Sequence, residues 1–176
     1  MSRDGAPMTY LPADDSALLI DVLRDYKGEA CLEIGFGSGA VISSLTERFS
    51  VAVATDLAAP QGETDAKGLF LADRASCFRD RVFDLVAFNP PYLPSEGIDD
   101  RAVDGGAGGV EVPMRFLDDA LRVLRSDGKI LVLLSDSGDV QRFLAHATRL
   151  GLSAKERRRK RLFYETLLVF ELSRRD

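Results

Sequence analysis

The sequence has few of the residues on which many enzyme mechanisms depend. Its 176 residues include one histidine, His146, two cysteines, Cys31 and Cys77, and no tryptophan. The cysteines have no paired spacing, whereas zinc sites are built from clusters of cysteine and histidine. His146 falls on a polar helix face beside Arg142 and Arg149, where a solvated surface role is expected. We therefore expect no protein-held metal, no histidine base and no cysteine nucleophile.

Long hydrophobic runs and an excess of positive charge are also missing. No apolar run approaches the roughly 20 residues that a membrane-spanning helix needs. Residues 1–10 lack the positive-then-apolar pattern of a secretory signal, so a cytoplasmic protein is expected. The net charge is −5, which argues against strong binding to nucleic-acid phosphates. The length and the 45% hydrophobic content predict one globular domain over residues 1–176.

Strand-like and helix-like segments alternate along the chain. Apolar spacing predicts helices over residues 18–23, 41–49, 113–124 and 140–147. Strands are expected over residues 30–34, 51–55, 68–72, 82–88, 129–134, 152–158 and 163–172. Strands separated by helices pair in parallel, which predicts a layered α/β sandwich, and the last two strands form an antiparallel hairpin. The connection over residues 57–67 is so short that its helix should be short or broken.

A glycine-rich turn follows the first predicted strand. The segment Glu33-Ile34-Gly35-Phe36-Gly37-Ser38-Gly39 lies where a strand passes into a helix, and glycines there let a ligand approach the backbone. Asp56 ends the next strand, where a carboxylate can accept hydrogen bonds from ribose hydroxyls. These features predict a nucleoside cofactor, either NAD or S-adenosylmethionine. Glu33 favours the methyl donor, because an acid helps to hold its ammonium group.

The tetrapeptide Asn89-Pro90-Pro91-Tyr92 follows a hydrophobic strand. A rigid turn at the carboxyl end of a central strand lies where open α/β sheets bind ligands. The side-chain oxygen of Asn89 and the backbone oxygen of Pro90 can accept both N–H groups of one planar NH2 group. Such acceptors stabilise the positive charge that develops on nitrogen during alkylation, so no base is needed before the transfer. Tyr92 and Phe88 are expected to flank the acceptor group or the sulfonium.

These motifs together resemble a known enzyme family. Glu33 to Gly39, Asp56 and Asn89 to Tyr92 look like a class I S-adenosylmethionine-dependent methyltransferase that acts on amino groups. More narrowly, the chain resembles the HemK family of protein-(glutamine-N5) methyltransferases in its short eukaryotic and archaeal form. Two other segments are similar to that subfamily: Tyr10-Leu11-Pro12-Ala13-Asp14-Asp15-Ser16 before Leu18-Leu19-Ile20-Asp21, and Asp104-Gly105-Gly106-Ala107-Gly108-Gly109.

The resemblance implies a fold and a set of site residues. The fold is a Rossmann-like, three-layer sandwich with a mostly parallel seven-stranded sheet and an antiparallel C-terminal hairpin. The donor contacts that it implies are Ser16, Glu33, Gly35, Gly37, Gly39, Asp56, Asp73, Arg74 and Asn89. Asp73 would meet the adenine amino group, whereas Arg74 stands where the family often has an apolar side chain. The implied catalytic residues are Asn89, Pro90 and Tyr92, and Pro91 joins them in binding the acceptor.

The family also implies partners. Its members methylate the glutamine of the Gly-Gly-Gln tripeptide in peptide-chain release factors, and the short form works with a small zinc-binding activator that pairs with the sheet edge. In this chain the third strand, Gly68-Leu69-Phe70-Leu71-Ala72, is apolar and would lie at such an edge. We expect the activator to bind there.

Other functions are compatible with the same residues. An N6-adenine methyltransferase acting on DNA or RNA shares the Asn-Pro-Pro-Tyr chemistry, although this chain has no spare length for a target-recognition region. The basic run Lys155-Glu156-Arg157-Arg158-Arg159-Lys160-Arg161 is either a solvated hairpin or a contact with RNA or an acidic partner. A non-catalytic donor-binding scaffold is a further alternative, although it gives Asn89 no role. An NAD-dependent oxidoreductase would leave the Asn-Pro-Pro-Tyr turn unexplained.

Overall fold

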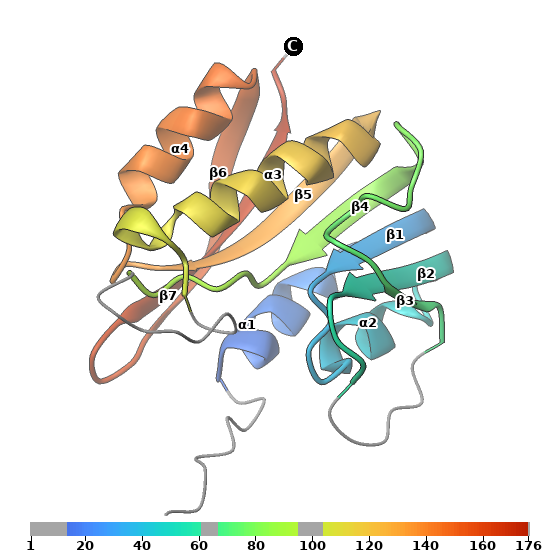
Figure 1. The fold of residues 1–176 in the computed structure, drawn as a ribbon, viewed down its shortest axis with the longest axis horizontal. Coiled ribbons are helices and arrows are strands. Elements are labelled where there is room, and N and C mark those ends of the chain that lie inside the picture. Colours follow the sequence, from blue (N-terminus) through green and yellow to red (C-terminus); the bar gives the residue numbers. More distant parts are fainter. Residues whose placement is uncertain (1–13, 61–66, 95–103, 176) are drawn as a thin grey trace, which may run out of the picture.

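The computed structural model describes residues 14–60, 67–94 and 104–175 (Figure 1). One seven-stranded sheet has the order β3-β2-β1-β4-β5-β7-β6. The strands are β1 (Gly28–Ile34), β2 (Phe49–Asp56), β3 (Leu69–Leu71), β4 (Phe83–Phe88), β5 (Leu124–Ser135), β6 (Leu152–Arg161) and β7 (Thr166–Arg174). The helices are α1 (Asp14–Leu23), α2 (Ala40–Leu45), the short 3₁₀ turn η1 (Ala107–Gly109), α3 (Glu111–Val123) and α4 (Val140–Arg149).

The first five strands run parallel, and β7 is antiparallel to both β5 and β6. The predicted mixed sheet with a C-terminal hairpin is thereby confirmed. The order reverses beside β1, because the chain first builds outward to β3 and then returns to place β4 on the other side. In open α/β sheets, ligands bind at the carboxyl ends of the strands next to such a reversal.

Helices cover both faces of the sheet (Figure 1). One hydrophobic cluster lies between the sheet and helices α3 and α4, and a second lies between the sheet and helices α1 and α2. Side chains alternate between the two along each strand, as the period of a strand requires. In β4, Val86 and Phe88 point toward α3, whereas Leu85 and Ala87 point toward α1. No helix in the described residues is long and apolar enough to cross a bilayer.

Two helices end earlier than their apolar spacing predicted. Phe49 is the first residue of β2 and pairs with Gly28, and Leu124 is extended and pairs with Phe83. Both side chains are buried, so the apolar pattern identified core positions correctly but assigned them to the wrong element. In α2 the hydroxyl groups of Ser43, Ser44 and Thr46 bond back to helix carbonyls, which competes with continuation of the helix. Thus α2 is only six residues long.

The connections around β3 contain no helix in their described residues. Between β2 and β3, residues 57–60 and 67–68 are described and are not helical, and the rest of that connection lies outside the described residues. Between β3 and β4 the chain forms turns that Arg122 of α3 fastens. Its guanidinium donates to the carbonyl oxygens of Ala75 and Phe78 at 2.7 and 2.8 Å.

The basic run lies in the edge strand β6 of the C-terminal hairpin. Several of its charges pair with carboxylates of the same chain. Arg157 contacts Glu171 and Asp25, and Arg158 lies 2.9 Å from a carboxylate oxygen of Asp21. These pairs join β6 to helix α1 and the residues just after it. The run therefore has a structural role that the sequence did not reveal.

Candidate active site

Three buried side-chain oxygens without a partner lie at the carboxyl edge of the parallel strands. Among the described residues, these atoms are Glu33 Oε2, Thr55 Oγ1 and Asn89 Oδ1. Glu33 and Thr55 lie near the ends of β1 and β2, and Asn89 directly follows β4. Ile34 pairs with Thr55 on one side and with Phe88 on the other, so the three strand ends are adjacent. Glu33 and Asn89 face the side of helices α1 and α2, whereas Thr55 shares the α3 side with its paired residue Ile34. Because buried polar groups are nearly always hydrogen-bonded, Glu33 Oε2 and Asn89 Oδ1 indicate a ligand site on the α1 side.

The glycine-rich turn has the conformation that its residues predicted. Gly35, Gly37 and Gly39 have φ angles of 82°, 48° and 79°, a region that favours glycine. The Gly35 N–H donates to the Thr55 carbonyl oxygen at 2.7 Å, and the Gly37 N–H donates to Asp56 Oδ2 at 3.1 Å. A Cβ atom at Gly37 would have no neighbour within 4 Å. Described atoms thus leave space beside this turn, next to the Asp56 carboxylate.

The Glu33 carboxyl is unusual in its burial. Only 3% of the residue is exposed, and it lies between Ala54 and Ala87 on the neighbouring strands. Burial raises the pKa of Glu33 well above its ordinary value, the Ile42 N–H bonded to it has the opposite effect, and the charge of Asp56 raises it further. A ligand cation beside Oε2 would stabilise the ionised form. These residues fit a nucleoside with a cationic tail, as the methyl donor has.

Asn89 is held in one orientation by a residue that the sequence did not place here. Its Nδ2 donates to Asp15 Oδ2 at 2.9 Å, across 74 positions of the chain. A carboxylate can only accept, so this bond fixes the amide with Oδ1 as the remaining acceptor. The family resemblance included Asp15 only as part of the segment from Tyr10 to Ser16 and gave it no role in the site. Strand alternation explains the meeting, because Phe88 faces α3 and Asn89 therefore turns toward α1.

The rest of the Asn-Pro-Pro-Tyr turn is packed tightly. Pro90 and Tyr92 are buried, and Pro91 is partly exposed. Gly105 and Gly109 lie against the Tyr92 backbone. A Cβ at Gly109 would come within 2.3 Å of the Tyr92 carbonyl oxygen, and Gly109 has a φ of 68°. Only glycine fits there. The Asn-Pro-Pro-Tyr turn and the segment 104–109, which both contribute to the family resemblance, therefore pack directly against each other.

Phe88 does not lie where the sequence suggested. Its ring is fully buried and packs against Phe116 of α3, with the ring centroids 5.7 Å apart. This is the face of the sheet opposite to Asn89. Phe88 therefore supports the turn through the core, and its packing gives no support to a contact with the acceptor group.

The remaining predicted donor contacts lie around the same edge. Ser16 is partly buried in the first turn of α1, and its N–H donates to Asp15 Oδ1 at 2.6 Å. Asp73 follows β3 and forms an ion pair with Arg74, in which Asp73 Oδ1 lies 2.9 Å from Arg74 Nη1. Arg74 has a φ of 48° and also pairs with Asp119 of α3 at 2.6 Å. Arg74 thus fixes the Asp73 loop to α3, a positioning role for a position that the family often fills with an apolar side chain.

Cys31 is buried in the core, and His146 pairs with an acidic side chain. Burial raises the pKa of the Cys31 thiol to about 12, so it carries no thiolate at neutral pH. His146 bonds to Asp118 at 2.7 Å and thereby joins α4 to α3. No group of three or more histidine, cysteine or acidic residues suited to a metal occurs among the residues that the structure describes.

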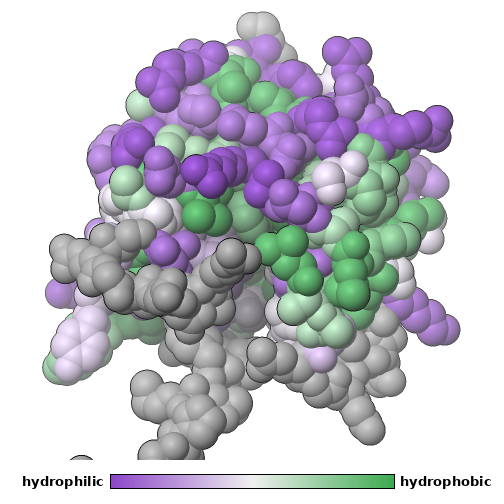
Figure 2. Space-filling view, in the orientation of Figure 1, coloured by the Kyte–Doolittle hydropathy of each residue, from purple (hydrophilic) through white to green (hydrophobic). Residues whose placement is uncertain are grey.

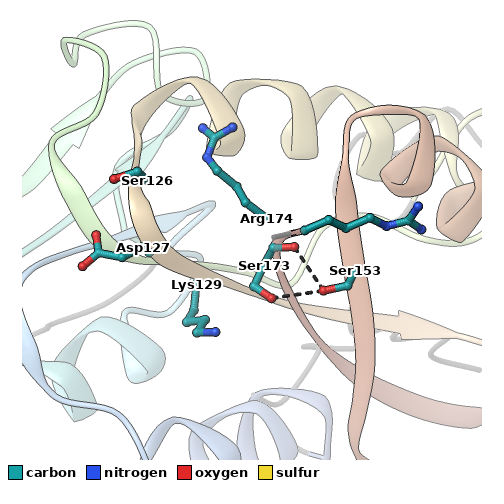
Figure 3. Close-up of a pocket in the computed structure, with 8 residues that line it drawn as sticks. Ser126, Asp127, Lys129, Ser153, Ser173 and Arg174 are labelled. Carbon is teal, nitrogen blue, oxygen red and sulfur yellow. Dashed lines mark hydrogen bonds between the residues drawn. The ribbon is translucent and has the colours of Figure 1, made fainter.

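A hollow at the amino end of the parallel strands is not a competing site (Figure 3). This open cavity of about 730 Å³ lies at the amino end of β5. Lys129 and Arg174 point in opposite directions in Figure 3, because Lys129 pairs with Glu171 and Arg174 donates to the Leu121 carbonyl oxygen. The polar groups around the hollow do not converge. Its lining residues are Ser126, Asp127, Gly128, Lys129, Ser153, Ser173, Arg174 and Arg175.

Known proteins with the same fold and sequence pattern are methyltransferases. A Methanocaldococcus jannaschii protein named as a protein N5-glutamine methyltransferase is 31% identical over 179 aligned residues, covering 93% of this chain and 90% of its own. Methyltransferase HEMK2 of Mus musculus is 29% identical and covers 94% and 89% of the two chains. The solved E. cuniculi Mtq2–Trm112 complex has a chain that matches with a TM-score of 0.79 and 26% identity, covering 94% and 98% of the two chains.

No protein-family model matches the sequence, so membership rests on these whole-chain relatives. The chain belongs to the HemK family of S-adenosylmethionine-dependent protein-(glutamine-N5) methyltransferases.

Proposed function

We propose that this enzyme transfers a methyl group to the side-chain amide nitrogen of the glutamine in the Gly-Gly-Gln motif of a peptide-chain release factor. The observation that carries the proposal is the buried, unpartnered Asn89 Oδ1, held in place by Asp15. The Mtq2–Trm112 complex is described as responsible for methylating the termination factor eRF1, which supports the same acceptor for this chain. Asn89, Pro90 and Tyr92 are then the catalytic residues, and Pro91 helps to shape the acceptor site.

The chain's own groups act on the acceptor amide. Asn89 Oδ1 and the Pro90 carbonyl oxygen accept the two N–H groups, which favours a localised nitrogen lone pair as positive charge develops there. S-adenosylmethionine supplies an electrophilic methyl group on a sulfonium. The new N–C bond would form as the S–C bond of the donor breaks, and one N–H proton would then pass to solvent. No protein base is required, in keeping with the lack of histidine at this edge.

The donor would be held along the ends of β1, β2 and β3. Glu33 would bind the ammonium group, the glycine turn would pass beside the donor, and Asp56 would accept from the ribose hydroxyls. Asp73 would meet the adenine amino group, with Arg74 holding its loop, and Ser16 would contact the donor from α1. These roles rest on the position of each residue and on the family resemblance.

Replacing Glu33 with glutamine should weaken binding of the donor product, S-adenosylhomocysteine, by about 10- to 100-fold, the loss of one buried charge-assisted hydrogen bond. The raised pKa of Glu33 means that the folded, ligand-free protein binds this proton more tightly than the unfolded chain does. The contribution of Glu33 to folding stability is therefore greatest below its unfolded pKa and falls as the pH rises toward the folded value. Binding of an ammonium group releases this proton, so product affinity should rise with pH in the wild type.

Titration calorimetry in buffers of different ionisation enthalpy measures the affinity for S-adenosylhomocysteine and the number of protons released on binding. Glu33→Gln should flatten the pH dependence, whereas Glu29→Gln, an exposed position on the same strand, should leave it unchanged. Equal affinity of Glu33→Gln and the wild type across the pH range would rule out Glu33 as the ammonium site.

The exposed edge at β3 supports the proposal of an activator subunit. Exposed apolar side chains gather on and beside the β2–β3 edge: Val51, Leu57, Phe70 and Leu71, with Leu71 67% exposed. Figure 2 shows hydrophobic surface on this side of the molecule. Strand β3 is three residues long, and among the described strands it pairs only with β2. Such an edge needs a cover, and Mtq2 was solved with the small protein Trm112. We place a small zinc-binding activator on Gly68 to Ala72.

Leu71→Lys should reduce binding of the activator at least about 10-fold, because it buries a charge in an apolar contact. The same change should increase the solubility of the free enzyme, since it blunts the exposed edge. Calorimetry with the purified activator and a precipitation assay measure the two effects. Ser153→Lys adds the same charge on the opposite edge strand, β6, and should change neither. If Leu71→Lys also changes neither, the activator binds elsewhere.

No observation favours adenine over glutamine as the acceptor, although both carry a planar NH2 group. Pairing of Arg157, Arg158 and Arg159 with carboxylates reduces the positive charge that Lys155 to Arg161 offers to RNA. The proposal is tested by an assay with labelled donor, with and without the activator. Label should enter release factor and not its Gln→Ala variant. Transfer to DNA or RNA, or to the Gln→Ala variant, would overturn the proposed acceptor.

A further inference from the structure

Two aromatic side chains stand fully exposed at the turn between β6 and β7. Phe163 is 90% exposed and Tyr164 is 92% exposed. Their rings pack edge to face, with centroids 4.6 Å apart. Within the described residues, the other large hydrophobic side chains with high exposure all lie on or next to β2 and β3. We call Phe163 and Tyr164, with the turn that carries them, the aromatic tip.

The aromatic tip is displayed by an ordered turn. The Leu162 N–H donates to the Glu165 carbonyl oxygen at 2.8 Å and closes the turn. At its base, Thr166 and Asp136 bond to each other twice: the Thr166 N–H donates to Asp136 Oδ1 at 2.6 Å, and the Asp136 N–H donates to the Thr166 carbonyl oxygen at 3.0 Å. The hydrogen bonds from Thr166 hold the pKa of Asp136 below its ordinary value. These backbone and side-chain hydrogen bonds therefore hold the turn in one conformation that exposes both aromatic rings to solvent.

The tip lies at the carboxyl end of the parallel strands, as the candidate active site does. Strand β7 begins where β5 ends, with Leu167 paired to Ser135. From there, the Asp139 N–H donates to the Gly108 carbonyl oxygen at 2.8 Å, and the segment 105–109 packs on Tyr92. In Figure 1 this turn projects at the lower left, beyond the ends of β5 and β4. A protein that docks on the tip therefore lies at the same end of the sheet as Asn89.

Charge and ring geometry favour a protein partner over RNA. An open hollow of about 450 Å³ beside the tip is lined by both rings and by Arg159 and Arg161, but also by Asp136 and Glu165. The two carboxylates would repel phosphates. The edge-to-face contact also turns the rings toward each other instead of leaving parallel faces on which bases could stack. Exposed aromatics next to arginine are typical of the contacts that carry most of the energy in protein–protein interfaces.

We propose that the aromatic tip is the docking contact for the body of the acceptor protein, outside the methylated tripeptide. The complementary surface should present an apolar depression bordered by at least one carboxylate, to receive the rings and Arg161. This inference rests on the proposed function, because it takes the acceptor to be a folded protein. It predicts that the tip contributes to the affinity for the whole factor and not to the chemical step.

The test compares a whole factor with a short Gly-Gly-Gln peptide as acceptors. Phe163→Ser/Tyr164→Ser should raise KM for the release factor at least about 10-fold, with kcat at saturation unchanged, and should leave kcat/KM for the peptide unchanged. Both side chains are exposed, so the unfolding temperature should not change. Glu47→Ser, an exposed change at the opposite edge of the sheet, should leave all of these values unchanged.

Each outcome distinguishes the inference from the proposed function. If the wild type does not methylate the factor, the proposed function fails. If the wild type methylates the factor and the double variant has an unchanged KM, the docking role is wrong. A parallel loss of peptide methylation would also overturn it, because the tip would then act on the active site. Loss of binding to a structured RNA with an unchanged KM would assign the tip to RNA instead.

Discussion

Asn89→Ala is expected to lower the rate of methyl transfer to the release factor by about 10³-fold or more. The variant removes the oriented acceptor at the end of β4, and loss of one preorganised group that stabilises developing charge typically costs a factor of 10² to 10³. It also removes the partner that fixes the acceptor nitrogen, which adds an orientation loss. Single-turnover kinetics with labelled donor measure the chemical step directly.

Donor binding separates this effect from general damage to the site. S-adenosylhomocysteine should bind Asn89→Ala within a few-fold of the wild type, because Glu33 and Asp56 are intact. Asn89→Asp keeps the size of the side chain and its oxygen acceptor but replaces the Nδ2 donor with a second oxygen. This oxygen would face Asp15 Oδ2, which lies 2.9 Å from Asn89 Nδ2 in the wild type. The repulsion should turn the side chain, so this variant should be nearly as slow. A rate above a tenth of the wild-type value in Asn89→Ala would show that Asn89 is not catalytic.

Asp15→Ala is expected to lower kcat by about 10- to 100-fold. This is the usual loss when a group that orients a substrate-binding side chain through a hydrogen bond is removed. In the wild type the Asp15 carboxylate fixes which end of the Asn89 amide faces the acceptor. Asp15→Asn should be no better, because its own N–H can pair with Asn89 Oδ1 after that amide turns over. In both variants KM for the factor and donor affinity should change much less than kcat.

A matched change on the same helix tests whether the effect comes from helix stability alone. Asp21 of α1 forms half-exposed pairs with Arg24 and Arg158, and each such pair contributes at most about 1 kcal/mol. Asp21→Ala should lower the unfolding temperature slightly and leave kcat unchanged. If Asp15→Ala lowers the unfolding temperature and donor affinity together with kcat, its role is structural.

The sequence predicted the parts of the fold that local patterns determine. The alternation of apolar segments predicted parallel strands with a C-terminal antiparallel hairpin, as the structure has them. The φ angles of Gly35, Gly37 and Gly39 agree with the predicted turn. Helix ends were less predictable. Phe49 and Leu124 continue the apolar spacing of the preceding helices, but backbone pairing with Gly28 and Phe83 draws them into strands. Spacing reports burial, whereas the boundary depends on partners elsewhere in the sheet.

Contacts between distant segments could not be predicted. Asp15 had no predicted role in the site, and only the position of α1 against the end of β4 brings it to Asn89. The basic run looked like a free charged surface, because the carboxylates of Asp21, Asp25 and Glu171 that pair with it are distant in sequence. Thr55 carried no signal at all, since threonine is common in strands. Only the structure shows that its hydroxyl is buried without a partner among the described residues.

The most direct test is a crystal structure of the enzyme with S-adenosylhomocysteine and a Gly-Gly-Gln peptide. We expect the glutamine NH2 within hydrogen-bond distance of both Asn89 Oδ1 and the Pro90 carbonyl oxygen, with its nitrogen facing the sulfur of the bound product. Asp15 should still accept from Asn89 Nδ2. A structure in which the glutamine lies elsewhere, or in which Asn89 Oδ1 stays sealed from both ligands, would contradict the proposed mechanism.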